Sequence, residues 1–132
     1  MNLKNKYDVL GYTKYNKGLG LAIKDPLLTI ILCNLIEKLN IRGNSCEKHY
    51  SDKYIKNEPY YFSYDRTYIC ESELGIDYDR YNRNLEKLKK RNLIQYWKGR
   101  AKHETGYYTI YFHLNIEEIN KLFKRCAEIL NI

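Results

Sequence analysis

The sequence lacks the paired cysteines that disulfide-rich domains and zinc sites need. Its four cysteines are scattered, with no Cys-x-x-Cys pair: Cys33, Cys46, Cys70 and Cys126. Three of them, all except Cys46, fall in apolar helical patterns, which favours buried free thiols in a reducing cytoplasm. Cys46 and His49 have the spacing of half a zinc site, but no second close pair completes it. We therefore expect no metal and no cofactor.

Long hydrophobic runs are also absent. The first fifteen residues hold no sustained apolar run, so the sequence predicts neither a signal peptide nor a membrane anchor. The longest apolar stretch, 27–39, includes four polar residues and is shorter than the roughly 20 residues that a bilayer-spanning helix needs. At 132 residues, the chain is expected to form one domain with its own core.

No catalytic constellation stands out either. The three histidines have no evident partners, and neither a catalytic triad nor a pair of carboxylates is recognisable. Gly18-Leu19-Gly20 resembles a fragment of a phosphate loop, but it lacks the third glycine and the Lys-Ser/Thr that nucleotide-binding loops carry. We expect a binding protein and not an enzyme.

What the chain has in excess is positive charge, and this charge is concentrated. The 23 basic and 16 acidic residues give a net charge of +7. Between Asp77 and His103, nine basic residues stand against three acidic ones, a local net charge of +6. An AT-rich genome would account for abundant lysine but not for its concentration. A solvated charged face is the simpler alternative, and a nucleic-acid surface is the interpretation that the surrounding pattern favours.

That surrounding pattern, over 64–114, predicts two helices joined by a tight turn. Asp65 is placed to cap a short first helix that continues through Cys70 and Glu71. Leu74-Gly75-Ile76 makes the turn, and Asp77 caps the second helix.

The second helix, 77–91, has one apolar and several polar faces. Tyr81, Leu85 and Leu88 follow helical spacing and form an inward stripe. Asn92 ends the helix, because asparagine tolerates the left-handed conformation found just past helix ends. The outward positions hold a mixture suited to base edges and phosphates: Tyr78, Asp79, Asn82, Arg83, Glu86, Lys87 and Lys90.

A β-hairpin is predicted to follow this helix. Leu93-Ile94 turns into the core, and 94–97 and 107–114 are rich in β-branched and aromatic residues. The segment 98–106 between them is basic and bounded by glycine, as expected of a charged hairpin tip. Upstream, 59–64 is predicted to be the first strand of the same sheet.

The two ends of the chain differ in their signals. Residues 1–24 are polar and rich in turn signals, which predicts an irregular arm with at most a short strand pair. Asp25-Pro26 starts a helix over 27–39, whose apolar face is wider than one core contact requires. At the other end, Asn115 precedes Glu118 in a capping box of the Asn type. The helix that follows carries an apolar stripe of Ile119, Leu122, Phe123, Cys126 and Leu130.

Together these features resemble winged-helix DNA-binding proteins. The resemblance covers about 25–115 and rests on Leu74-Gly75-Ile76, on the arginines at the start of the second helix, on Asn92-Leu93-Ile94 and on the basic hairpin. The apolar helix followed by an aromatic strand is similar to winged-helix proteins of phages and plasmids that act in replication initiation. The resemblance implies an α+β fold: a winged helix-turn-helix core, 25–114, with an N-terminal arm, 1–24, and a C-terminal helix, 115–132.

The resemblance also implies that 77–91 is a recognition helix for double-stranded DNA and that 98–106 is a wing that contacts the adjacent DNA backbone or minor groove. The expected DNA contacts are Tyr78, Arg80, Asn82, Arg83, Lys87, Lys90, Lys98, Arg100, Lys102 and His103. A homodimer would present two such helices, through Leu27, Ile30, Ile119, Phe123 and Leu130. Packing of these side chains within the chain's own core is the alternative.

Three biological roles stay open at this point. The first is replication initiation in a phage or plasmid, together with other replication proteins. The second is centromere binding in plasmid partition, or transcriptional repression, on the same scaffold. The third is a mobile-element module that binds or inhibits a host protein, although a mimic of DNA would be acidic and this chain is basic.

Overall fold

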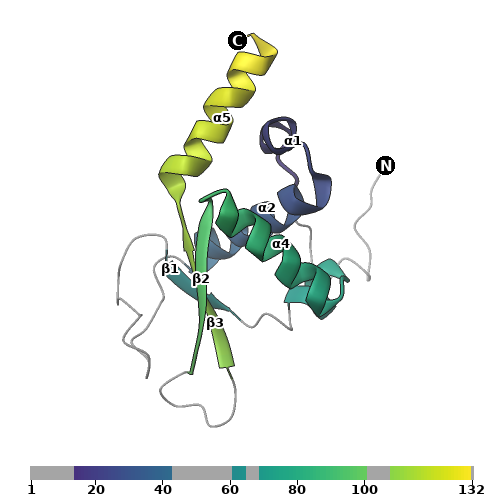
Figure 1. Cartoon of the computed structure of the whole chain (residues 1–132), viewed down its shortest axis with the longest axis vertical. Helices are drawn as coiled ribbons and strands as arrows, with labels where there is room; N and C mark the ends of the chain where they lie inside the picture. Colours follow the sequence, from purple (N-terminus) through teal and green to yellow (C-terminus); the bar gives the residue numbers. More distant parts are fainter. Residues whose placement is uncertain (1–13, 43–60, 65–68, 101–107, 132) are drawn as a thin grey trace.

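The computed structural model describes residues 14–42, 61–64, 69–100 and 108–131, and within these ranges the chain has an α+β fold (Figure 1). The elements, in chain order, are α1 (Lys17–Ile23), α2 (Pro26–Arg42), β1 (Tyr61–Tyr64), η2 (Ile69–Leu74), α4 (Tyr78–Lys90), β2 (Ile94–Arg100), β3 (Tyr108–Leu114) and α5 (Ile116–Leu130). No helix in the described ranges is long and apolar enough to cross a membrane.

The three strands form one antiparallel sheet in the order β1-β3-β2. β2 and β3 make the predicted hairpin, in register from Ile94 opposite Leu114 to Arg100 opposite Tyr108. The predicted upstream strand is confirmed as β1, which pairs with the other edge of β3. β2 is longer than expected, however. The backbone at Lys98 and Arg100 therefore belongs to the paired strand and not to the tip, because the ladder continues past Trp97.

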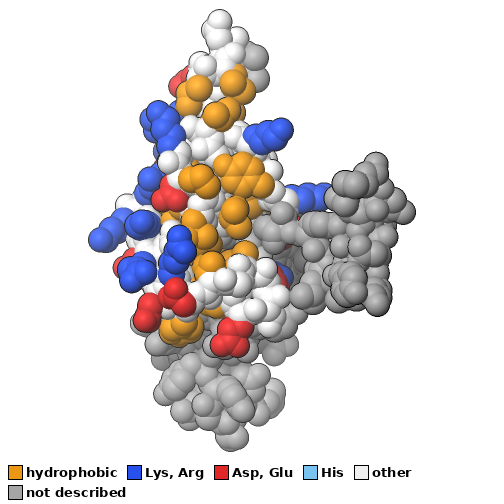
Figure 2. Space-filling view, turned by 90° about the vertical axis from the view of Figure 1, so that its right-hand side faces the viewer, with side chains coloured by type: hydrophobic (Ala, Val, Ile, Leu, Met, Phe, Trp, Pro, Cys, Tyr) orange, Lys and Arg blue, Asp and Glu red, His pale blue; other side chains and the backbone are white. Residues whose placement is uncertain are grey.

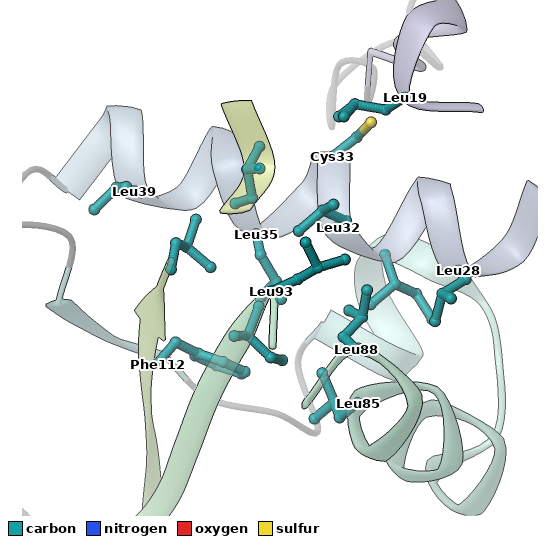
Figure 3. Close-up of a cluster of buried hydrophobic side chains, with 14 of the residues drawn as sticks. Leu19, Leu28, Leu32, Cys33, Leu35, Leu39, Leu85, Leu88, Leu93 and Phe112 are labelled. Atoms are coloured by element: carbon teal, nitrogen blue, oxygen red, sulfur yellow. The ribbon is translucent and has the colours of Figure 1, made fainter. Parts of the chain in front are cut away.

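The core lies where α2 crosses α4 and the sheet. Figure 3 shows side chains of α2 meeting those of α4 and the hairpin, and most of them are fully excluded from solvent. Burial of each large apolar side chain contributes about 1.5–3 kcal/mol to stability. The core residues drawn in Figure 3 include Leu28, Leu32, Leu35, Leu85, Leu88, Leu93 and Phe112.

α2 confirms the predicted start and exceeds the predicted length. The Oδ1 atom of Asp25 accepts a hydrogen bond from the backbone N–H of Leu28 at 3.1 Å, and the helix continues to Arg42. Its polar positions have partners. Asn34 donates to Glu73 at 2.9 Å, and Lys38 forms an ion pair with the same carboxylate. These contacts hold η2 against α2, and they explain how an apolar helix accommodates Asn34 and Lys38.

The turn between η2 and α4 confirms the predicted Leu74-Gly75-Ile76. Gly75 has φ +63°, a conformation that glycine adopts without steric cost. The Ile76 N–H donates to the Cys70 carbonyl at 3.1 Å. The helix before the turn is a π-helix that runs to Leu74, past the predicted Glu71. The predicted cap, Asp65, lies outside the described residues.

The prediction of an irregular arm over 1–24 is wrong for its last part, because 17–23 form helix α1. Asn16 caps this helix by accepting from the Leu19 N–H at 3.0 Å, and Lys24 ends it in the left-handed conformation. A β-carbon on Gly18 would lie 3.2 Å from the Cys126 sulfur, so this glycine allows α1 to approach α5 closely. It therefore marks a helix contact and not a turn.

α5 extends away from the sheet and lies alongside α1 (Figure 1). Asn115 caps it as predicted, by accepting from the Glu118 N–H at 3.3 Å. The reciprocal half of the predicted capping box is not formed, because the Asn115 N–H donates to the Leu93 carbonyl at 2.9 Å. Glu118 forms an ion pair with Lys121 instead, at 2.8 Å.

Candidate nucleic-acid interface

The candidate interface is built on α4. Asp77 caps the helix, since its Oδ1 accepts from the Arg80 N–H at 2.8 Å. The predicted stripe of Tyr81, Leu85 and Leu88 is confirmed, with each side chain 0% exposed. The end is confirmed as well: Asn92 has φ +61°, and Leu93 and Ile94 are buried directly after it. One face of α4 is thus fixed in the core and the opposite face is free to meet a ligand.

A basic stripe runs along the solvent side of α4. Arg80, Arg83, Lys87 and Lys90 are exposed and follow one another at intervals of three and four residues, which places them on adjacent turns of one face. None of the four forms an ion pair within the described ranges. Figure 2 shows lysine and arginine side chains gathered along one edge of the molecule. Their charges are therefore available to an anionic partner.

The flank of α4 beside the hairpin is engaged by strand β2. The Tyr96 hydroxyl donates to the Glu86 carboxylate, and the Lys89 ammonium lies 5.4 Å from the centroid of the Tyr96 ring. Tyr78 and Asn82 lie on the same flank by helical spacing, with Tyr78 exposed and Asn82 half-buried. Tyr96 therefore fixes how α4 sits against β2. The sequence pattern did not single out this contact, because it depends on the tertiary placement of a strand.

Arg91 plays a role that the sequence could not indicate. Its Nη1 donates to the Ile23 carbonyl at 3.4 Å, at the last turn of α1. A cation at this position complements the partial negative charge of a helix C-terminus. Arg91 thus joins the end of α4 to α1. The contact was missed because α1 itself was not predicted.

The predicted wing contacts are only partly covered by the structure. The backbone at Lys98 and Arg100 pairs with Ile110 and Tyr108 of β3. Lys102 and His103 lie outside the described residues.

The residues predicted to form a dimer interface differ in how much of each side chain is exposed. Ile119 is 2% exposed and belongs to the chain's own core, so its assignment to an interface is wrong. Leu27 and Ile30 are half-buried. Phe123 and Leu130, in contrast, are 40% and 50% exposed. Figure 2 shows a band of hydrophobic side chains that runs down one face from the level of α5.

Burial shifts the pKa of one histidine and one cysteine among the described residues. No group of three potential metal ligands occurs among the described residues. Burial lowers the pKa of His113, so this side chain stays neutral near pH 7. Cys33, Cys70 and Cys126 are buried free thiols, as expected, and desolvation raises the pKa of Cys33. Cys46 lies outside the described residues.

The fold places the chain in the α+β class. Comparisons with protein-family models, with curated proteins and with solved structures find no match.

Proposed function

We propose that the protein binds double-stranded DNA in a sequence-specific manner, as a winged helix-turn-helix in which α4 is the recognition helix and the β2–β3 hairpin is the wing. The observation that supports this proposal is the stripe Arg80, Arg83, Lys87 and Lys90, which is exposed and has no ion-pair partner within the described ranges. It lies opposite a face that is completely buried. A rigid helix with one basic face suits the major groove.

The positions of the side chains on α4 suggest which of them would contact bases and which would contact phosphates. Arg83 is exposed near the middle of the outward face, where it would donate two hydrogen bonds to a guanine. Asn82 and Tyr78 lie on the hairpin flank of α4 and would contact neighbouring bases. Arg80, in the first turn, would also lie near the bases, whereas Lys87 and Lys90 would bind phosphates. In the wing, Lys98, Arg100, Lys102 and His103 would meet the adjacent backbone, where charge binds without reading much sequence.

The biological role proposed first is replication initiation in a phage or plasmid, by the resemblance described above. Plasmid partition and transcriptional repression need the same interface. A footprint within an origin, a repeat array or a promoter would distinguish among the three. A function in binding a host protein would instead give no footprint on any of these DNAs.

Salt dependence tests the proposal most directly. If each of two protomers makes roughly five phosphate contacts, the plot of the logarithm of the association constant against the logarithm of salt concentration should have a slope of about −9. This corresponds to about 0.9 per contact. Fluorescence anisotropy with a duplex oligonucleotide measures this slope. A slope near zero would exclude DNA binding of this kind.

Matched charge removal separates the proposed interface from general attraction. The double variant Lys87→Ala/Lys90→Ala should reduce the slope by about 0.9 for each phosphate that is no longer neutralised, or about 2 per protomer. Lys121→Ala/Lys124→Ala removes two exposed cations from α5, so it changes the net charge equally while leaving α4 intact. Equal reductions in both variants would show that the attraction is not localised on α4.

A further inference from the structure

Glu86 is an exposed carboxylate on α4, where the basic stripe meets the flank that faces the hairpin. Arg83 lies three residues before it and Lys90 four residues after it, so both are neighbours on the helix surface. A carboxylate at this place repels phosphates and lowers affinity for any DNA. Asp79, the other acidic residue of α4, lies in the first turn, where the helix dipole favours negative charge. Glu86 gains nothing from the dipole, because it lies well beyond that turn.

The structure holds Glu86 in a defined position. The Tyr96 hydroxyl, from strand β2, donates to its Oε1 atom, and the ring of Tyr96 also carries the Lys89 ammonium at 5.4 Å. Recognition groups work best when a second side chain fixes their orientation before the ligand arrives. The carboxylate has a second oxygen, Oε2, for a further hydrogen bond.

We propose that Glu86 reads a cytosine in the major groove by accepting a hydrogen bond from the cytosine N4 amino group, and that Tyr96 is the residue that positions it. This inference rests on the proposed function, and it specifies which base that function selects. Arg83, one turn earlier, would donate to a guanine, so acceptor and donor would stand side by side.

The edges of the other bases explain why a carboxylate would select cytosine. Guanine presents two acceptors and thymine one, so each would face the carboxylate with like partial charge. Adenine offers a donor, but its N7 acceptor lies beside it. Cytosine is the base that presents a donor without an acceptor in this groove. Glu86 would therefore act mainly by rejecting the wrong bases, which is a recognised route to specificity.

The test is a selection of sites from a random duplex library with the full chain, followed by anisotropy titrations on single-base variants of the selected site. The unmodified protein should select a site with one position that strongly prefers cytosine, by about tenfold or more over the other bases. Glu86→Ala should reduce the preference at that position to less than about twofold and raise affinity for random DNA, because a repulsive charge is removed. All other positions of the site should keep their preference.

Two further variants separate readout from a structural effect. Glu86→Gln keeps the shape, and the preference at the same position should move from cytosine to adenine, because glutamine pairs with adenine in two hydrogen bonds. Tyr96→Phe leaves the charge unchanged, so it should weaken the cytosine preference without altering affinity for random DNA. Glu117→Ala removes another exposed carboxylate, on α5, and should change neither the cytosine preference nor the affinity for random DNA. Circular dichroism confirms the fold of each variant.

The outcomes distinguish this inference from the function on which it rests. If the unmodified protein selects no site and binds DNA without salt dependence, the proposed function fails and the inference falls with it. If it selects a site that Glu86→Ala and Glu86→Gln leave unchanged, DNA recognition stands and the role of Glu86 is refuted. A site without any cytosine-preferring position refutes it equally.

Discussion

Arg83 is the single side chain on which base recognition should depend most. It is exposed near the centre of the outward face of α4 and has no ion pair to break on binding within the described ranges. Arg83→Ala should cost about 1–3 kcal/mol on the selected sequence and much less on random DNA. Lys124→Ala, on α5, is the matched control. It should lower affinity for the selected sequence and for random DNA by the same small amount. If Arg83→Ala lowered affinity for both DNAs equally, α4 would contact phosphates and not read bases.

His113 should make stability depend on pH. Burial lowers its pKa below the ordinary value, so the unfolded chain takes up a proton at a higher pH than the folded chain does. Stability should therefore be unaffected by this group above about pH 6.5 and should decrease as the pH falls below it. Urea unfolding at several pH values measures the trend, and His113→Gln should flatten it below about pH 6.5. An unchanged trend in the variant would place the effect elsewhere.

Single residues with a local role were predictable from the sequence. Asp77, Gly75 and Asn92 act through the backbone within a few positions of themselves, and each adopts the expected conformation or cap. The roles of Tyr96 and Arg91 depend on elements that approach from elsewhere in the chain. No pattern within a short window contains that information.

At the scale of elements, α1 shows where sequence patterns mislead. Gly18 and Gly20 lower helix propensity, by about 1 kcal/mol each relative to alanine, and they suggested a turn. In the structure they make room, Gly18 for Cys126 and Gly20 for the Tyr15 ring. The helix is stabilised by tertiary contacts, because Leu19, Ala22 and Ile23 are buried. Propensity alone could not reveal this compensation.

Asn115 should be the most sensitive cap in the protein. Its Oδ1 caps α5, and its Nδ2 donates to the Asn92 carbonyl at 3.0 Å. Asn115→Ala removes both hydrogen bonds, so it should cost about 1–2 kcal/mol of unfolding free energy or somewhat more. Asp77→Ala, which removes a cap with one such bond, should cost about 1 kcal/mol.

Chemical denaturation of both variants measures this difference. Asn115→Asp keeps the acceptor and removes the amide donor, so its stability should lie between those of the unmodified protein and Asn115→Ala. If Asn115→Asp were as unstable as Asn115→Ala, the cap would contribute nothing and the bond to Asn92 would account for the entire effect.

At the scale of the whole molecule, the question is whether two chains associate. Phe123, Ile129 and Leu130 leave much apolar surface exposed on α5, which suggests a homodimer through this helix. Phe123→Asp should then give a folded monomer with reduced affinity for DNA that carries two half-sites. Light scattering at micromolar concentration measures the mass. Tyr78→Asp changes an equally exposed aromatic residue on α4 and should leave the mass unchanged.

A monomeric unmodified protein, with and without DNA, would contradict the dimer. Loss of folding in Phe123→Asp would show that this side chain supports the chain's own core. In that case Leu130→Asp, at the more exposed position in the last turn, tests the same surface with less risk to the fold.

The α+β class, the hairpin and the basic face of α4 were predictable, because hydrophobic periodicity and charge can be read from short stretches of sequence. The arrangement around α5 was not. Ile119 and Phe123 belong to one apolar stripe in the sequence, yet the first is buried and the second is exposed. Cys126, further along the same helix, is buried beside Gly18 of α1, so the cover over α5 depends on α1, a helix that the sequence did not predict.

The hydrogen bonds from Asn115 to Asn92 and Leu93 close the base of the hairpin. The chain leaves α4 and enters α5 at nearly one point, while the strands between them pair with β1 and contribute Phe112 to the core. The length of the connection between β2 and β3 is therefore uncoupled from the relation between the two helices. A longer connection between Arg100 and Tyr108 would cost only about 0.6 kcal/mol for each doubling. This segment is thus a place where the chain could gain or exchange residues during evolution, or accept an engineered tag, while the helices remain as they are.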